Sequence, residues 1–296
     1  MWRWAVVCLT VAGCAGHGVV SDGSSLSYGQ GNEGILTGGV QLPESGDGYW
    51  VPPRWRQRGN IYGTEEIVTM IVRVGRRLQR ELPDSPPFGV ADLSPPGGGP
   101  SRFHRSHQTG RDVDVLFFMT DANGKPVPST AMVKLDEDGV DAAGRRFDVA
   151  RNWALVRALI EEPSVEIQYI FVYEPLEMKL LEYARDQGEP NGVVEFASYV
   201  LHQPSDSAPH DDHFHVRVHC APEDRLLGCS DRGLIRWKKK GYKYELLEAA
   251  GGVAVSAIAA PASMYAVALP PSRFLRAWSL LLPMPFQYRL RTLAAR

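Results

Sequence analysis

Residues 106–119 read SHQTGRDVDVLFFM, and residues 210–218 read HDDHFHVRV; these two stretches decide the predicted fold. The first begins with alternating polar and apolar residues at Asp112 and then stays apolar to Met119, which predicts a strand that enters the core. The second alternates from His213 onward and predicts another strand, ending at Cys220. On a strand, side chains two residues apart lie on one face, roughly 6.5–7 Å apart. The D-x-D and H-x-H sequences therefore each project a pair of polar groups from one face.

The sequence predicts several helices before and between these two strands. Thr64 precedes two glutamates and an apolar periodic run, which favours the start of a helix there, and Pro83 ends it. Periodic patterns predict helices over residues 64–82, 148–162, 175–187 and 193–202, a strand over 165–173, and an irregular Gly-rich arm over 26–60. Strands and helices without regular alternation predict an α+β fold, in which helices flank a small antiparallel sheet.

The composition limits the classes of protein to which the chain can belong. It has 296 residues, a formal net charge of −2 and 44% hydrophobic residues. These values exclude a wholly disordered chain, and the near-zero charge predicts no nucleic-acid partner. The start of the chain predicts a leader and linker over 1–25, and the resemblance described below implies one domain over 26–235 and an extension over 236–296. The extension is predicted to be loosely ordered, with a membrane span as the weaker alternative, and it suggests no function.

The first residues resemble an export signal. Arg3 gives a positive start, and the run from Trp4 to Ala12 is apolar but too short to span a membrane. The sequence Val11-Ala-Gly-Cys14 resembles a bacterial lipobox, and a lipidated Cys14 would tether the protein to a membrane. The alternative is ordinary cleavage nearby. In an oxidising compartment, Cys220 and Cys229 are predicted to form a disulfide that closes a short loop.

Histidines and aspartates gather in the two stretches quoted above. His104, His107 and Asp114 belong to the first region, and His210, His213 and His215 belong to the second. Imidazole nitrogens with one carboxylate suit Zn²⁺. Either both histidines of H-x-H bind the metal, or one binds it while the other faces a substrate. The remaining histidines, His17, His202 and His219, are predicted to be ordinary surface or core residues, and the chain lacks the H-E-x-x-H, G-x-S-x-G and phosphate-loop motifs.

Together these motifs resemble the penicillin-insensitive murein endopeptidases, a family of zinc peptidases related to lysostaphin-type and D-Ala-D-Ala peptidases. The shared H-x6-D and H-x-H patterns fall on His107, Asp114, His213 and His215. The segments LPESGDGYWV (42–51), ADLSPPGGGP (91–100) and IFVYEPL (170–176) add to the likeness, which covers about residues 26–233.

The resemblance implies roles for individual residues. His107, Asp114 and His215 would be zinc ligands, and His104 matches another metal-associated position of the family. His213 matches a position with an acid/base role, and His210 matches a further active-site histidine.

One pattern of the family is not matched. A second metal site of the family's prototype uses D-x-x-H, but Arg151 stands three residues after the candidate Asp148. No second site is therefore predicted.

The implied function is a periplasmic zinc D,D-endopeptidase that hydrolyses peptide cross-links of peptidoglycan. Its partners would be the peptide stems of the wall, and Asp212 is an alternative to the histidines as the proton-transfer group. Two rival hypotheses stay open. The same site could remove a terminal D-amino acid from uncross-linked stems, as a carboxypeptidase does. The domain could also be a zinc-stabilised wall-binding module without turnover, because a fold does not by itself imply a function.

Overall fold

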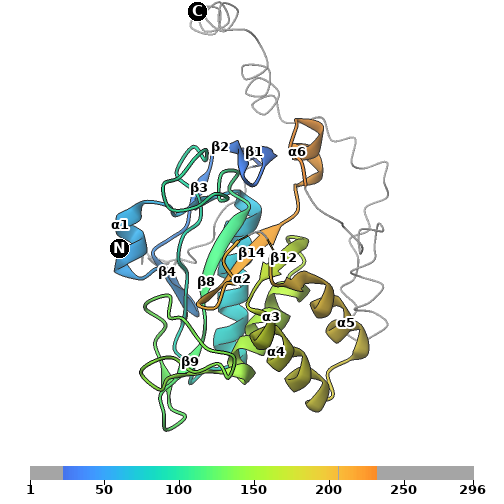
Figure 1. Ribbon diagram of the computed structural model, residues 1–296. Helices are drawn as coiled ribbons and strands as arrows, with labels where there is room; N and C mark the ends of the chain where they lie inside the picture. The colour runs from blue at the N-terminus through green and yellow to red at the C-terminus, as the bar shows by residue number, and fades with distance from the viewer. Residues whose placement is uncertain (1–22, 206, 232–296) are drawn as a thin grey trace, which may run out of the picture.

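The computed structural model describes residues 23–205 and 207–231 (Figure 1). The predicted leader with Cys14, apart from its last residues, and the predicted extension lie outside the described residues. Within the described residues, no helix combines the length and the apolar character that a membrane crossing requires. The α+β class is confirmed, because helices pack around several small sheets.

A four-stranded sheet with the strand order β13-β12-β14-β8 lies at the centre of the fold. Its strands are β8 (Asp112–Leu116), β12 (Ile167–Phe171), β13 (Leu201–His202) and β14 (His213–Val218). The pairs β12–β14 and β14–β8 are antiparallel, whereas β12–β13 is parallel. The sheet is therefore mixed at one edge, where the sequence predicted an antiparallel arrangement throughout. Short parallel pairing arises because α5 returns the chain to the same edge before β13.

The main helices agree with the predicted ones to within a few residues. They are α2 (Glu65–Glu81), α3 (Val149–Glu161), α4 (Glu174–Asp186) and α5 (Asn191–Val200). In Figure 1, α3, α4 and α5 lie together beside β12. The helix predicted over 193–202 was wrong at its end, because residues 201–202 pair with β12 as β13. At the start of α2, Ser25 rather than Thr64 supplies the capping hydroxyl, which accepts a hydrogen bond from the Glu65 N–H at 2.9 Å.

The arm before α2 is more regular than predicted. It contains β1 (Leu26–Gln30), β2 (Glu33–Thr37), β3 (Val40–Gln41), β4 (Ser45–Gly46), β5 (Tyr49–Trp50), α1 (Pro53–Arg58) and β6 (Tyr62–Gly63). Tyr49 and Trp55 are buried in the main core. The strands β3 to β6 are two residues long and carry no periodicity, and the five-residue strands β1 (LSYGQ) and β2 (EGILT) lack a clear alternation of polar and apolar residues.

The remaining elements are short. They are β7 (Phe88–Gly89), β9 (Met119–Thr120), β10 (Pro126–Val127), β11 (Arg146–Phe147) and α6 (Pro222–Leu226). The strand predicted to Met119 is interrupted after Leu116, because the Phe118 N–H donates to Asn152 Oδ1 instead of a neighbouring strand. The predicted disulfide between Cys220 and Cys229 is present.

The two faces of the central sheet differ in character. Val113, Val115, Phe214 and Val216 belong to the hydrophobic core. The intervening residues are aspartate on β8, and histidine and arginine on β14. Alternation along both strands therefore gives one face to the core and gathers the polar side chains on the other.

Candidate metal centre

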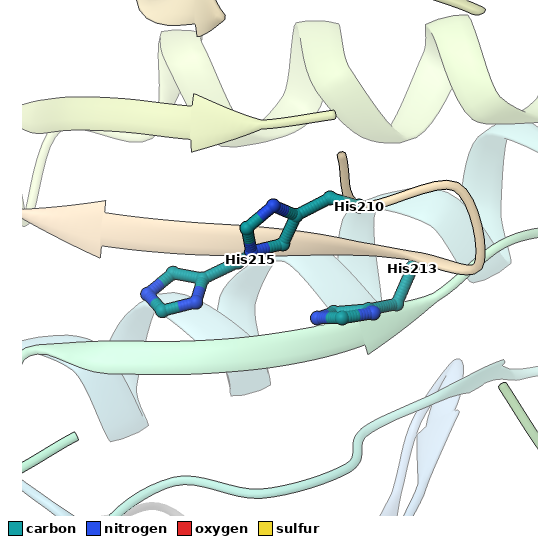
Figure 2. A group of neighbouring side chains, drawn as sticks. All are labelled: His210, His213 and His215. Carbon is teal, nitrogen blue, oxygen red and sulfur yellow. The ribbon is translucent and has the colours of Figure 1, made fainter. Parts of the chain in front are cut away.

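The register between β8 and β14 places the D-x-D and H-x-H residues side by side. His215 pairs with Asp114, and Arg217 pairs with Asp112. His213 lies two residues before His215 on the same face, and His210 comes from the loop that leads into β14. Figure 2 shows the three histidine rings on one side of this strand pair. The predicted sharing of faces is thus present in the structure.

The loop before β8 brings His107 to the same place. His107 is fully buried and has a φ of 64°, a left-handed conformation that is uncommon for a residue with a side chain. Its Nδ1 lies 2.9 Å from the Leu93 carbonyl oxygen. Because a carbonyl oxygen can only accept, Nδ1 carries a proton, and Nε2 is the ring nitrogen that faces Asp114 and could bind a metal once deprotonated.

Asp114 is the centre of the cluster. Its Oδ1 lies 3.2 Å from His107 Nε2, 3.3 Å from His213 Nε2 and 3.4 Å from His215 Nδ1. The side chain is completely buried, yet neither carboxylate oxygen accepts a hydrogen bond from any group that the structure describes. A buried carboxylate without hydrogen bonds is costly, so such an arrangement calls for another partner.

The distances to Asp114 are compatible with a shared tetrahedral metal ion. Zinc binds histidine nitrogen and carboxylate oxygen at about 2.0–2.2 Å, which separates two tetrahedral ligand atoms by about 3.3 Å. The three nitrogen-to-oxygen distances around Asp114 match that separation. Two separate groups, His104–His107–Asp114 and His210–His213–His215, each bring their ligand atoms within 4.8 Å of one another.

Neighbouring carboxylates hold two of these histidines with one ring nitrogen directed at Asp114. Asp112 Oδ1 lies 2.8 Å from His215 Nε2, so that Nδ1 faces Asp114. Asp212 Oδ1 lies 2.5 Å from His213 Nδ1, so that Nε2 faces Asp114. Outer partners of this kind fix the tautomer and the ring orientation of metal-binding histidines.

His104 is less directly placed. Its ring centroid lies 4.3 Å from that of His107, but its Nε2 lies 2.8 Å from Asp92 Oδ2 and 3.7 Å from Asp114 Oδ2. Asp92 is completely buried and also pairs with Arg58. The structure therefore brings His104 to the edge of the cluster, with one ring nitrogen engaged by Asp92.

His210 stands above the other two histidines of its group. It has a φ of 58°, and its backbone carbonyl accepts a hydrogen bond from the Tyr173 N–H at 3.1 Å. Its ring centroid lies 5.1 Å from that of His213 and 5.5 Å from that of His215. Burial, and then the proximity of His215 and His213, lowers the pKa of His210 to about 3, so the ring is neutral at pH 7.

Burial and neighbouring charges shift the pKa values of the cluster residues in different directions. Burial would raise the pKa of Asp114, but the attraction of His107 and His213 outweighs it and holds the pKa well below its usual range. Burial lowers the pKa of His215 to about 4. Burial also opposes the charged form of His213, but Asp114 and Asp212 overcome it and raise its pKa to about 10. In the metal-free protein, His215 is thus neutral and His213 carries a proton at pH 7.

The other predicted positions lie outside the cluster. Asp148 caps α3 and forms an ion pair with Arg151, with 2.6 Å between Asp148 Oδ2 and the guanidinium nitrogen. His202 is exposed near Phe171, and His219 is buried with Nδ1 3.1 Å from Asp231 Oδ2. The sequence pattern gave no role to Asp92, Asp112 or Arg217; of these, Asp112 could have been recognised because it shares a face with Asp114.

Comparisons with known proteins identify the family of the chain. The sequence model of the penicillin-insensitive murein endopeptidases matches residues 27–239. A penicillin-insensitive murein endopeptidase of Haemophilus influenzae is 30% identical over 239 residues, which cover 73% of this chain and 74% of that protein. The enzymes of the same name from Salmonella heidelberg and Klebsiella pneumoniae are 27% and 26% identical, over 72% and 71% of each chain respectively. The chain belongs to the penicillin-insensitive murein endopeptidase family.

Proposed function

We propose that this protein is a zinc-dependent D,D-endopeptidase that hydrolyses peptide cross-links in peptidoglycan. The observation that carries the proposal is the completely buried Asp114 carboxylate, which accepts no hydrogen bond in the described structure and faces three imidazole nitrogens at 3.2–3.4 Å. Membership of a murein endopeptidase family supports the hydrolytic activity and the class of substrate.

His107, Asp114 and His215 are the proposed zinc ligands, with His104 as a further metal-associated residue. His107 and His215 each have one ring nitrogen held by a hydrogen-bond partner and the other directed at Asp114. When bound here, zinc would activate a water molecule and polarise the carbonyl of the scissile peptide. Three protein ligands would leave a coordination position for that chemistry.

His213 and His210 are the proposed proton-transfer groups. His213 holds a proton in the metal-free protein and could donate it to the leaving amine. His210, whose ring centroid lies 5.1 Å from that of His213, is the second candidate for this proton transfer. Asp212 binds His213 Nδ1, which supports a role in orienting that ring over a role as the base. His213 Nε2 is as close to Asp114 as the proposed ligand atoms are, so the metal content of a His213 variant tests this assignment.

The class of substrate implies where the protein acts. Peptidoglycan lies outside the cytoplasmic membrane, so we expect the protein in the periplasm. The Cys220–Cys229 disulfide is consistent with an oxidising compartment. The proposed membrane tether at Cys14 lies outside the described residues and stays a prediction from the sequence.

The test is a digest of purified dimeric muropeptides, with product analysis, in zinc-loaded and EDTA-treated protein. We expect zinc-dependent release of monomers, loss of both metal and activity in His215→Ala, and loss of rate with retained metal in His213→Ala. His202→Ala is the matched control, because this exposed histidine lies outside the cluster, and it should behave as wild type. Release of free D-Ala without separated stems would instead identify a carboxypeptidase. Binding of zinc and muropeptide without hydrolysis would identify a wall-binding module.

A further inference from the structure

An exposed aromatic ring with two guanidinium groups against it stands next to the candidate metal centre. Phe103 immediately precedes His104 and is 37% exposed. The Arg58 guanidinium carbon lies 4.4 Å from the centroid of this ring, and the Arg102 guanidinium carbon lies 4.7 Å from it. An exposed aromatic residue flanked by cations is a feature that neither the core nor the proposed zinc ligands require.

Two more arginines extend this feature. Arg54, at the start of α1, lies over the Trp55 ring at 5.7 Å, and Arg105 is exposed directly after His104. We call the set of Arg54, Arg58, Arg102, Phe103 and Arg105 the arginine rim. Residues 53–58 and 101–107, which supply it, contain no acidic residue.

Most of the charge on the arginine rim is not neutralised. Arg58 pairs with Asp92, whereas Arg54, Arg102 and Arg105 form no ion pair with any residue that the structure describes. Like charges gathered on adjoining segments repel one another and cost stability. Such a cost is understandable if an anion binds there.

The arginine rim is continuous with the candidate metal centre. Asp92 Oδ2 lies 2.5 Å from the Arg58 guanidinium nitrogen and 2.8 Å from His104 Nε2. One buried carboxylate thus joins a rim arginine to a histidine of the site. A ligand held by the rim would lie beside the proposed reacting centre.

We infer that the arginine rim binds a carboxylate of the peptide stem and thereby positions the cross-link; this inference rests on the proposed function. An arginine stacked on a ring keeps its in-plane N–H groups free, and their fork matches the two oxygens of a carboxylate. A peptide stem ends in a carboxylate, and the Phe103 ring offers an apolar surface to the adjacent side chain. Arg102 and Arg105 are the residues that contact the substrate, and Arg58 holds Phe103 and Asp92 in place.

The test compares two muropeptide dimers, one with free carboxylates and one whose carboxylates have been converted to amides. The Arg102→Gln/Arg105→Gln protein should show a KM about 5- to 20-fold higher on the free-carboxylate dimer, with kcat within about twofold of wild type. Amidation should weaken the wild type to a similar extent and leave the double variant unchanged. Equilibrium binding of both dimers to EDTA-treated protein should show the same pattern without turnover.

The matched control is Arg80→Gln/Arg146→Gln, which removes the same charge from two exposed arginines outside the arginine rim. It should retain the wild-type KM and binding on both dimers. Wild-type binding by the rim variant, or an equal loss on free and amidated dimers, would overturn the inference. If the wild type lacked turnover altogether, the proposed function would fail, and the binding experiment would still decide whether the rim holds a carboxylate.

Discussion

Arg111 and Asp114 are both buried charges at the same strand, but they have opposite surroundings. Arg111 donates to Ser27 Oγ, the Val218 carbonyl and Asp231 Oδ1, each at 3.0 Å. Asp114 accepts no hydrogen bond among the described residues and faces three imidazole nitrogens. The two groups show how a chain can use a buried charge either to join segments or to hold a site ready for a ligand.

The difference follows from what each group joins. Arg111 connects β1, the end of β14 and the segment beyond the disulfide, and Asp231 also accepts from the Cys220 N–H at 3.0 Å. Its charge is compensated within the protein, so this cluster is complete as it stands. The Asp114 carboxylate accepts no hydrogen bond among the described residues, and its cluster could hold a metal ion. Stability is therefore expected to depend on Arg111, and metal binding on Asp114.

Replacing Asp114 should have the largest effect on activity. Asp114→Asn keeps the shape of the side chain but removes the charged ligand, so we expect turnover of dimeric muropeptides to fall by about 1,000-fold or more. The melting temperature of the EDTA-treated variant should fall only modestly below that of EDTA-treated wild type, because the variant loses the attraction of His107 and His213 that holds the pKa of Asp114 low but also loses the cost of burying a charge. A large loss of metal-free stability would show that Asp114 is structural, as Arg111 is.

Replacing Arg111 should have the largest effect on stability. Arg111→Met removes three hydrogen bonds of a buried cation and leaves Asp231 paired with Arg225 at 3.0 Å, so we expect a loss near the lower end of the about 3–5 kcal/mol that breaking a buried ion pair costs. Denaturant unfolding of the zinc-free protein measures this change. Zinc affinity of the folded fraction should stay within about twofold of wild type, and a parallel loss of zinc affinity would contradict the separation of the two clusters.

Asp112 lies between Arg111 and Asp114 in the sequence, and replacing it should weaken metal binding moderately. Its carboxylate holds His215 Nε2, so Asp112→Asn should weaken zinc binding by about 10- to 100-fold, the usual cost of losing an outer partner. Competition with a chelator of known affinity provides the measurement. Asp121→Asn, which changes a turn residue outside the cluster, is the control and should leave the affinity unchanged.

The smallest expected effect is on the stability of the metal-free protein in acid. Burial raises the pKa of Asp112, but the attraction of Arg217, with help from His215, outweighs it and holds the pKa below the unfolded value of about 3.9. Because the folded pKa is the lower one, Asp112 stabilises the protein above about pH 4, and this contribution is lost as the pH falls further. In EDTA-treated protein, unfolding free energy should decline less steeply below pH 4 in Asp112→Asn than in wild type. Equal slopes would contradict the assignment.

The sequence was sufficient for the parts of the fold that have a clear period. The α+β class, the four main helices and the shared faces of Asp112 with Asp114 and His213 with His215 all follow from patterns of 3.6 or two residues. The two-residue strands before α2 carry no such pattern. The parallel pairing of β13 depends on a contact between segments distant in sequence, which local patterns do not encode.

The candidate site likewise contains residues that the sequence motifs indicate and residues that only the tertiary fold brings together. Family motifs indicated His107, Asp114, His213 and His215, and the structure brings these residues together. The partner of His104 could not be predicted, because Asp92 follows β7 and reaches the site only through the tertiary fold. The left-handed backbone at His107 and His210 was equally hidden, since neither residue is of the glycine type that signals such a conformation.

The most direct test of the central claim is the zinc content of wild type and Asp114→Asn, each loaded with zinc, freed of excess metal and measured by atomic absorption. The account predicts about one tightly bound zinc ion per wild-type chain and none in the variant, while both proteins give the same circular dichroism spectrum. Equal zinc content in the two proteins would contradict the role assigned to the buried carboxylate.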